Sequence, residues 1–166
     1  MKMIKMIVVT GLPGTGKTTF AQALAAEIKA THLNTDIIRD ALGKRGQYDT
    51  ATKAFVYENM LQQAETALHN GVDVIIDGTF YQQTWRKAFA KLAKKQQAAI
   101  YWIEIKADEA LVRTRVSQPR PYSEADYAIY LKIKAAYEPI DVPCLELWSD
   151  REDLNDMIAH AKIYLQ

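Results

Sequence analysis

The sequence predicts a three-layer α/β/α fold, in which helices cover both faces of a five-stranded parallel sheet. Apolar runs of strand length alternate with helical patterns along the chain, an arrangement typical of βαβ units. The first apolar run leads into a glycine-rich loop and then into a segment of good helix formers. Because crossovers between parallel strands are right-handed, we expect the carboxyl ends of the strands at one edge, where ligands bind.

The expected strands cover about residues 4–9, 32–34, 72–76, 98–105 and 144–148. The expected helices cover about residues 17–29, 35–42, 50–70, 85–97, 108–117 and 123–137, and a last helix begins near residue 151. Glycine and proline mark the boundaries: Gly71 follows the long helix, and Pro139 and Pro143 bracket the turn into the last strand. Ser123 and Asp126 have the spacing of a capping box, which predicts a helix start there.

The loop at residues 11–18 reads Gly-Leu-Pro-Gly-Thr-Gly-Lys-Thr and matches the phosphate-binding loop, or P-loop. Its glycines allow successive backbone N–H groups to point into one anion-sized hollow, and the following helix adds the positive end of its dipole. Lys17 can reach the β- and γ-phosphates, and the Thr18 hydroxyl can ligate Mg²⁺. The predicted nucleotide-binding residues of this loop are Gly11, Pro13, Gly14, Thr15, Gly16, Lys17, Thr18 and Thr19. The motif therefore predicts a P-loop NTPase fold.

Composition and charge are those of an ordinary globular domain. The chain of 166 residues is 49% hydrophobic and 25% charged, with a net charge of +1, so it carries no global electrostatic signature of nucleic-acid or membrane binding. Residues 1–166 are most simply one domain. The single cysteine, Cys144, cannot form an internal disulfide, and the first apolar run is too short for a signal peptide or membrane span. We therefore expect a cytoplasmic protein without membrane association.

The sequence lacks the Asn-Lys-x-Asp motif of guanine recognition, which argues against a GTPase. It also lacks the length and the accessory domain expected of a ring-forming ATPase. The remaining features favour a small phosphotransferase.

Asp36 follows the second expected strand and so should lie at the ligand-binding edge, with Arg39 on the same helical face. A carboxylate there can accept the proton of an attacking hydroxyl, and the guanidinium can hold the acceptor or orient the carboxylate. The alternative is an ordinary helix-capping aspartate with a solvated arginine.

Asp77 ends the third expected strand, where a carboxylate can position Mg²⁺ or contact the acceptor. The alternative is an aspartate that only caps its own turn. Thr79 and Arg86 come from the following loop and helix and can reach the acceptor, although Arg86 is equally compatible with a surface charge.

Three arginines surround the break at Pro119 and Pro121, which predicts a short lid over about residues 117–124. Arg120 is best placed on that loop to close over the γ-phosphate. Arg115 can contact the nucleotide. Because Arg113 lies only two residues from it, the two cannot both face the site from one helix.

Several of these motifs, taken in chain order, resemble one family. They are Gly-Leu-Pro-Gly-Thr-Gly-Lys-Thr-Thr at 11–19, Asn-Thr-Asp-Ile-Ile-Arg at 34–39, Val-Ile-Ile-Asp-Gly-Thr-Phe at 74–80, Arg-Thr-Arg at 113–115 and Ser-Glu-Ala-Asp at 123–126. They are similar to the small P-loop kinases that resemble the kinase domain of polynucleotide 5′-kinase, with zeta-toxin-like and chloramphenicol-phosphotransferase-like enzymes as relatives. The resemblance extends to about Pro139.

The resemblance implies that Lys17 and Thr18 bind the phosphates and Mg²⁺, that Asp36 is the general base, and that Arg39 holds the acceptor. It implies that Arg120 is the lid arginine. Gly78 stands where relatives often have alanine, serine or threonine. The sequence has no phosphatase or ligase domain and no evident basic stripe, which weakens the assignment to a polynucleotide acceptor.

We therefore expect an ATP-dependent kinase that requires Mg²⁺ and transfers the γ-phosphate to a hydroxyl of a small molecule, a nucleoside or a polynucleotide 5′ end. Two alternatives stay open. One is a zeta-toxin-like kinase that acts on a sugar nucleotide, and the other is a regulatory module that binds ATP without an acceptor. The oligomeric state is not indicated by the sequence.

Overall fold

The computed structural model describes residues 2–121 and 125–166 and contains a sheet of five parallel strands. The strands are β1 (Lys5–Thr10), β2 (Thr31–Asn34), β3 (Val74–Asp77), β4 (Ala99–Lys106) and β5 (Leu145–Trp148). They are arranged across the sheet in the order β2-β3-β1-β4-β5. The central strand β1 pairs with β3 on one side and with β4 on the other, so the predicted parallel sheet is confirmed.

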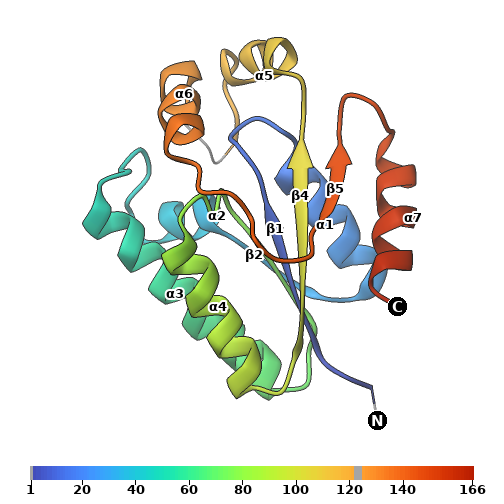
Figure 1. The fold of residues 1–166 in the computed structure, drawn as a ribbon. Helices are drawn as coiled ribbons and strands as arrows, with labels where there is room; N and C mark the ends of the chain where they lie inside the picture. The colour runs from blue at the N-terminus through green and yellow to red at the C-terminus, as the bar shows by residue number, and fades with distance from the viewer. Residues whose placement is uncertain (1, 122–124) are drawn as a thin grey trace.

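The helices of the described residues are α1 (Lys17–Ile28), α2 (Thr35–Ala41), α3 (Thr50–His69), α4 (Gln83–Lys95), α5 (Glu109–Val116), α6 (Tyr127–Ala136) and α7 (Leu154–Tyr164). The helices α3 and α4 cover one face of the sheet, and α1 and α7 cover the other (Figure 1). This is the predicted three-layer α/β/α architecture. Within the described residues, no helix is both long enough and apolar enough to cross a membrane.

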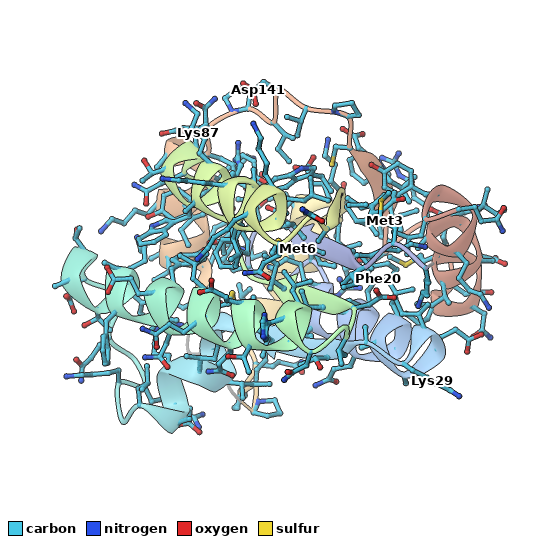
Figure 2. All side chains as sticks on the ribbon, turned by 90° about the horizontal axis from the view of Figure 1, so that it is seen from below. Met3, Met6, Phe20, Lys29, Lys87 and Asp141 are labelled. Atoms are coloured by element: carbon cyan, nitrogen blue, oxygen red, sulfur yellow. The ribbon has the colours of Figure 1, made fainter. Side chains whose placement is uncertain are left out.

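The two cores follow from the alternation of side chains along the strands. Met6 and Val8 of β1 point into the core shared with α3 and α4, whereas Ile7 and Val9 point into the core shared with α1 and α7. Both faces are covered, which explains why β1 reads as a continuous apolar run rather than an alternating one. Seen from below, Met6 and Phe20 lie in the interior between the surrounding helices (Figure 2).

The helices α5 and α6 lie beyond the carboxyl ends of the strands, on the side to which the arrowheads point (Figure 1). Val112 and Val116 of α5 form a small core there with Tyr130 of α6, and Leu12 packs against it. The two helices therefore cover the carboxyl edge of the sheet, and the P-loop lies between them and the sheet.

At three of the predicted boundaries that differ from the structure, an aspartate side chain lies next to the start of the element. Helix α6 begins at Tyr127 rather than Ser123, since Asp126 Oδ1 accepts the Ile129 N–H at 2.9 Å. Ser123 itself lies outside the described residues. Helix α7 begins at Leu154 rather than near residue 151, because Asp153 caps it.

The third difference concerns the strand expected at 72–76, which begins at Val74 as β3. Asp73 precedes it and accepts the Lys5 N–H at 2.9 Å and the Lys2 ammonium at 2.8 Å. These bonds tie the amino ends of β1 and β3 together and occupy Asp73 in a structural role.

Candidate active site

Close packing at two glycines holds the P-loop in place. A Cβ on Gly11 would lie 2.3 Å from the Ile105 carbonyl oxygen, and a Cβ on Gly14, whose φ is +77°, would lie 2.6 Å from Cγ1 of Val116. A larger residue at either position would therefore push the loop away from β4 or α5. The loop ends at Gly16, which caps α1 without a side chain, so the first N–H groups of α1 receive no capping oxygen from that residue.

Lys17 starts helix α1, and its side chain is buried. Its ammonium donates a hydrogen bond to the Leu12 carbonyl at 2.8 Å, which folds the side chain back over the loop. Burial lowers the pKa of Lys17 below its usual value, and the carboxylates of Asp77 and Asp36 act in the opposite direction. The charges of Lys17, Asp36 and Asp77 thus act on one another within one site.

A chain of side-chain contacts joins α1 to the ends of β2 and β3. The Asn34 amide nitrogen donates to Oγ1 of Thr18 at 3.1 Å and to Oδ2 of Asp77 at 2.7 Å. The same Asp77 oxygen lies 3.1 Å from Nε2 of His32. Asp77 is fully buried, and among the described residues its other oxygen, Oδ1, has no hydrogen-bond partner. Asn34 therefore fixes the distance between the P-loop threonine and this carboxylate.

These oxygens fit the ligand preference of Mg²⁺. Magnesium binds oxygen ligands and keeps several waters, so one hydroxyl and one carboxylate beside nucleotide phosphates are enough for it. The unpartnered Oδ1 of Asp77 is an acceptor that still needs a partner, and it lies at the end of the strand beside the P-loop. Among the described residues there is no group of three or more histidine, cysteine, aspartate or glutamate residues of the kind that holds an all-protein metal site.

Asp36 and Arg39 form an ion pair on α2. A guanidinium nitrogen of Arg39 donates to Oδ1 of Asp36, and the guanidinium lies 4.6 Å from the ring centroid of Tyr48. Burial raises the pKa of the Asp36 carboxyl above its usual value, while the nearby charges of Arg39 and Lys17 lower it. Arg39 is buried, and its Nε has no hydrogen-bond partner among the described residues. The pair therefore combines an oriented carboxylate with a guanidinium that retains an unused donor.

A cavity of about 840 Å³ brings most of the predicted residues together at the carboxyl edge of the sheet. The predicted residues that line it are Pro13, Gly14, Gly16, Lys17, Thr18, Thr19, Asp36, Arg39, Asp77, Thr79, Arg115 and Arg120. Gly11 and Thr15 support the loop instead: Thr15 Oγ1 donates to the Leu12 carbonyl at 3.0 Å and is not among the described lining residues.

The three predicted lid arginines have separate environments. Arg115 donates to the Gly14 carbonyl at 3.2 Å and to Ser149 Oγ at 3.1 Å, so it lies against the P-loop. Arg120 lines the cavity and donates to the Ala125 carbonyl. Arg113 is exposed and lies 5.0 Å from the ring centroid of Tyr127, away from the cavity lining of the described residues. The predicted lid includes residues 122–124, which lie outside the described residues.

Arg86 does not line the cavity in the described part of the chain, contrary to the expectation that it reaches the acceptor. Its buried guanidinium donates to the carbonyls of Phe80 at 2.6 Å, Glu138 at 2.6 Å and Pro139 at 2.9 Å. All the charge-bearing nitrogens are thus used to join the β3–α4 loop to the segment after α6. Arg86 is therefore a structural residue that holds the β3–α4 loop beside the site.

Residues that the sequence reasoning missed also belong to this site. The sequence marks Asn34 only as part of the motif at 34–39, although its place at the end of a strand beside Asp36 is a signal for a site residue. Ser149 donates to the Thr15 carbonyl at 2.6 Å and follows β5, so it too is at the carboxyl edge. Tyr81 and Lys53 line the cavity and contact each other, and no local pattern singles them out.

Residues 6–140 match the family model described as AAA domain (AAA_33), and the chain belongs to this family. The match covers the P-loop, Asp36, Asp77 and the lid segment. Together with the parallel sheet, it defines the chain as a P-loop protein of the kinase-like class.

A 155-residue stretch is 25% identical to the L-seryl-tRNA(Sec) kinase of Methanococcus maripaludis and covers 90% of this chain and 57% of that protein. Uncharacterised mycobacterial proteins, such as Rv2004c of Mycobacterium tuberculosis, are 29% identical over 125 residues, which cover 68% of this chain. The matched region makes up only 25% of the length of these mycobacterial relatives.

Solved structures of similar fold include a putative kinase from Chloroflexus aurantiacus, with a TM-score of 0.79 and 19% identity over 99% of this chain and 100% of that one. The APS kinase CysC of Mycobacterium tuberculosis, solved with AMPPNP and APS, has a TM-score of 0.76 and 18% identity over 99% of both chains. At these identities the likeness establishes the fold.

Proposed function

We propose that this protein is an ATP-dependent kinase that requires Mg²⁺ and transfers the γ-phosphate of ATP to a hydroxyl group. The observation that carries the proposal is the presence of Asp36, a carboxylate oriented by an arginine, in the same cavity as the P-loop lysine Lys17. A carboxylate placed there can accept the proton of an acceptor hydroxyl, a step that nucleotide binding alone does not include. The kinase names among the relatives and similar structures support the same class.

In this proposal the P-loop N–H groups and Lys17 bind the β- and γ-phosphates. Lys17 must exchange its bond to the Leu12 carbonyl for a phosphate oxygen, an exchange favoured by its buried position. Arg115 positions the loop through Gly14, and Arg120 stabilises charge on the transferred group.

Thr18 and Asp77 would hold the Mg²⁺ ion, which neutralises charge on the β- and γ-phosphates when bound. Asn34 keeps these two side chains together. This assignment uses the oxygen of Asp77 that has no other partner among the described residues.

Asp36 would take the proton of the acceptor hydroxyl on the oxygen that does not bond Arg39. The acceptor oxygen then forms a bond to the γ-phosphorus as the bond between that phosphorus and the β–γ bridging oxygen breaks, so ADP leaves and the proton stays on Asp36. The raised pKa of Asp36 suits a general base, because a more basic carboxylate accepts the proton more readily.

A cytoplasmic location stays a prediction from the sequence.

The test is transfer of the γ-phosphate from labelled ATP to a panel of acceptors that contains sugars, sugar phosphates, nucleosides, aminoglycosides and a 5′-hydroxyl oligonucleotide. We expect label on one class of acceptor, and a loss of about 10²-fold or more in Asp36→Asn with unchanged ATP binding. Asp40→Asn is the matched control, since Asp40 is exposed on the same helix and is not among the described lining residues. Transfer that survives in Asp36→Asn would contradict the assigned base, and ATP binding without transfer to any hydroxyl would favour a regulatory module.

A further inference from the structure

The cavity continues beyond the nucleotide-binding residues, on the side of the sheet where β2 and β3 end. Its lining there comes from α2, from the segment between α2 and α3, from α3, from the β3–α4 loop and from α6. We call this part the acceptor lobe. Its residues are Arg39, Tyr48, Lys53, Tyr57, Tyr81, Ile129, Lys132 and Ile133. In Figure 1, α6 lies on the same side of the molecule as α3 and α4, while α5 lies over β4.

The acceptor lobe has an excess of positive charge. It contributes three cations, Arg39, Lys53 and Lys132, and the carboxylate beside it is Asp36. Asp36 pairs with Arg39, whereas neither lysine has a carboxylate within ion-pair distance among the described residues. Lys132 is exposed to solvent, whereas Lys53 is half-buried. A half-buried cation without a carboxylate partner is costly, so Lys53 favours a ligand that brings negative charge to the lobe.

Lys53 is the cation whose position is best defined. It is half-buried on α3, its ammonium contacts the hydroxyl of Tyr81, and it lies 4.6 Å from the centroid of the Tyr81 ring. A lysine and a phenol side by side supply several hydrogen-bond donors to one oxyanion. Arg39 adds the buried Nε that has no partner among the described residues.

The backbone before Tyr81 is strained in a way that fixes this arrangement. Phe80 has a φ of +44°, in the left-handed region that is unfavourable for a non-glycine residue. Three contacts hold it: the Phe80 N–H donates to the Tyr57 hydroxyl at 3.2 Å, Arg86 donates to the Phe80 carbonyl at 2.6 Å, and the Glu138 N–H donates to the Tyr81 carbonyl at 2.9 Å. The surrounding structure therefore holds the Tyr81 backbone in one position at the wall of the cavity.

The remaining walls of the acceptor lobe are aromatic and aliphatic, formed by tyrosine rings and by Ile129 and Ile133. Such walls suit the carbon skeleton or ring of a small molecule. The whole cavity of about 840 Å³ must also hold the nucleotide, and it lies within the range of about 300–1,000 Å³ found for small-molecule sites. The space left inside the cavity for the acceptor is therefore that of a metabolite-sized group.

We propose that the acceptor is a small hydroxyl compound that also carries a phosphate or carboxylate group, and that Lys53, with Tyr81, binds that anionic group. The inference rests on the proposed kinase function, because the acceptor lobe is defined relative to the nucleotide. Lys53 does not touch the reacting hydroxyl in this proposal. It binds the acceptor and decides which acceptors are used.

The experiment uses protein saturated with Mg²⁺ and the non-hydrolysable analogue AMP-PNP, so that the P-loop is occupied. Inorganic phosphate, glucose 6-phosphate and glucose are titrated by calorimetry, with sodium chloride at equal ionic strength as the blank. We expect glucose 6-phosphate to bind at least about tenfold more tightly than glucose. In Lys53→Met, the affinity for glucose 6-phosphate should fall about tenfold. Lys53→Arg should keep most of it, and Lys87→Met, an exposed change on α4, should keep all of it.

Binding of phosphate and glucose 6-phosphate no stronger than the chloride blank, or equal binding in Lys53→Met, would overturn the inference and leave the kinase proposal standing. A 5′-hydroxyl oligonucleotide that binds at least about tenfold more tightly than glucose 6-phosphate, with a loss in Lys53→Met, would overturn the assignment to a small molecule. Failure of AMP-PNP itself to bind would instead contradict the nucleotide site. The melting temperature of each variant shows whether it is folded.

Discussion

The side-chain amide of Asn34 lies 2.7 Å from Oδ2 of Asp77, and the two residues are also register partners at the carboxyl ends of β2 and β3. Asn34 uses its other atom, Oδ1, to accept the N–H groups of Asp36 and Ile37 at 2.9 Å each. One side chain therefore caps α2, which carries the candidate base, and orients the candidate metal ligand. Asn34 therefore fixes the position of Asp36, the candidate base, relative to Asp77, the candidate metal ligand.

Replacing Asn34 should be costly for stability because both of these functions are lost. In Asn34→Ala, α2 loses its cap and the fully buried Asp77 carboxylate loses a donor, so we expect the free energy of unfolding to fall by about 2–4 kcal/mol. Urea denaturation measures it. Asp49→Ala is the matched control, since it removes only the cap of α3 and its contact with Thr52, and should cost about 1–2 kcal/mol. Equal losses would show that the bond to Asp77 contributes nothing.

The pH dependence of phosphoryl transfer should report on Asp36. Because burial raises its pKa, the base should be lost by protonation as the pH falls through a value above the usual range of aspartate. The charge of Arg39 lowers that pKa, so Arg39→Met should move the acid limb of kcat/KM to still higher pH. Rate profiles of the wild type and the variant measure the shift. A limb that moves to lower pH in Arg39→Met would contradict the assigned base.

Removing Arg86 should weaken the fold more than it changes acceptor binding directly. Its guanidinium donates to three carbonyls that join the β3–α4 loop to the segment after α6, and Arg86→Met leaves those acceptors without it. We expect a loss of about 3 kcal/mol or more in unfolding free energy, measured by chemical denaturation. The neighbouring change Lys87→Met, on the exposed face of α4, should cost less than about 0.5 kcal/mol. A loss as small in Arg86→Met would contradict the structural role.

Two arginines on α5, Arg115 and Arg113, allow a matched test of ATP binding, because only Arg115 contacts the P-loop. Arg115 donates to the Gly14 carbonyl and to Ser149, whereas Arg113 stacks on Tyr127 away from the P-loop. Arg115→Met should raise KM for ATP by about tenfold, because the loop loses a charge-assisted support, with a smaller effect on kcat. Arg113→Met should leave KM for ATP within about twofold. Similar effects of the two changes would argue against a role of Arg115 at the loop.

The sequence by itself determined the fold class and the edge at which the site lies. The P-loop pattern, the alternation of strands and helices and the carboxylates after two strands are local signals, and the handedness of βαβ units converts them into a common edge. The structure places Lys17, Asp36 and Asp77 around one cavity there, while their chemical roles stay predictions.

The tertiary structure alone decided which side chains face that cavity. Arg86 and Arg115 are both arginines on helices next to the site, yet Arg86 is used up by backbone carbonyls and Arg115 reaches the P-loop. The contact between Lys53 and Tyr81 joins residues 28 positions apart. The direction in which a side chain points depends on packing between elements that are distant in the chain. Periodicity and spacing in the sequence describe each element only by itself, so they do not predict that direction.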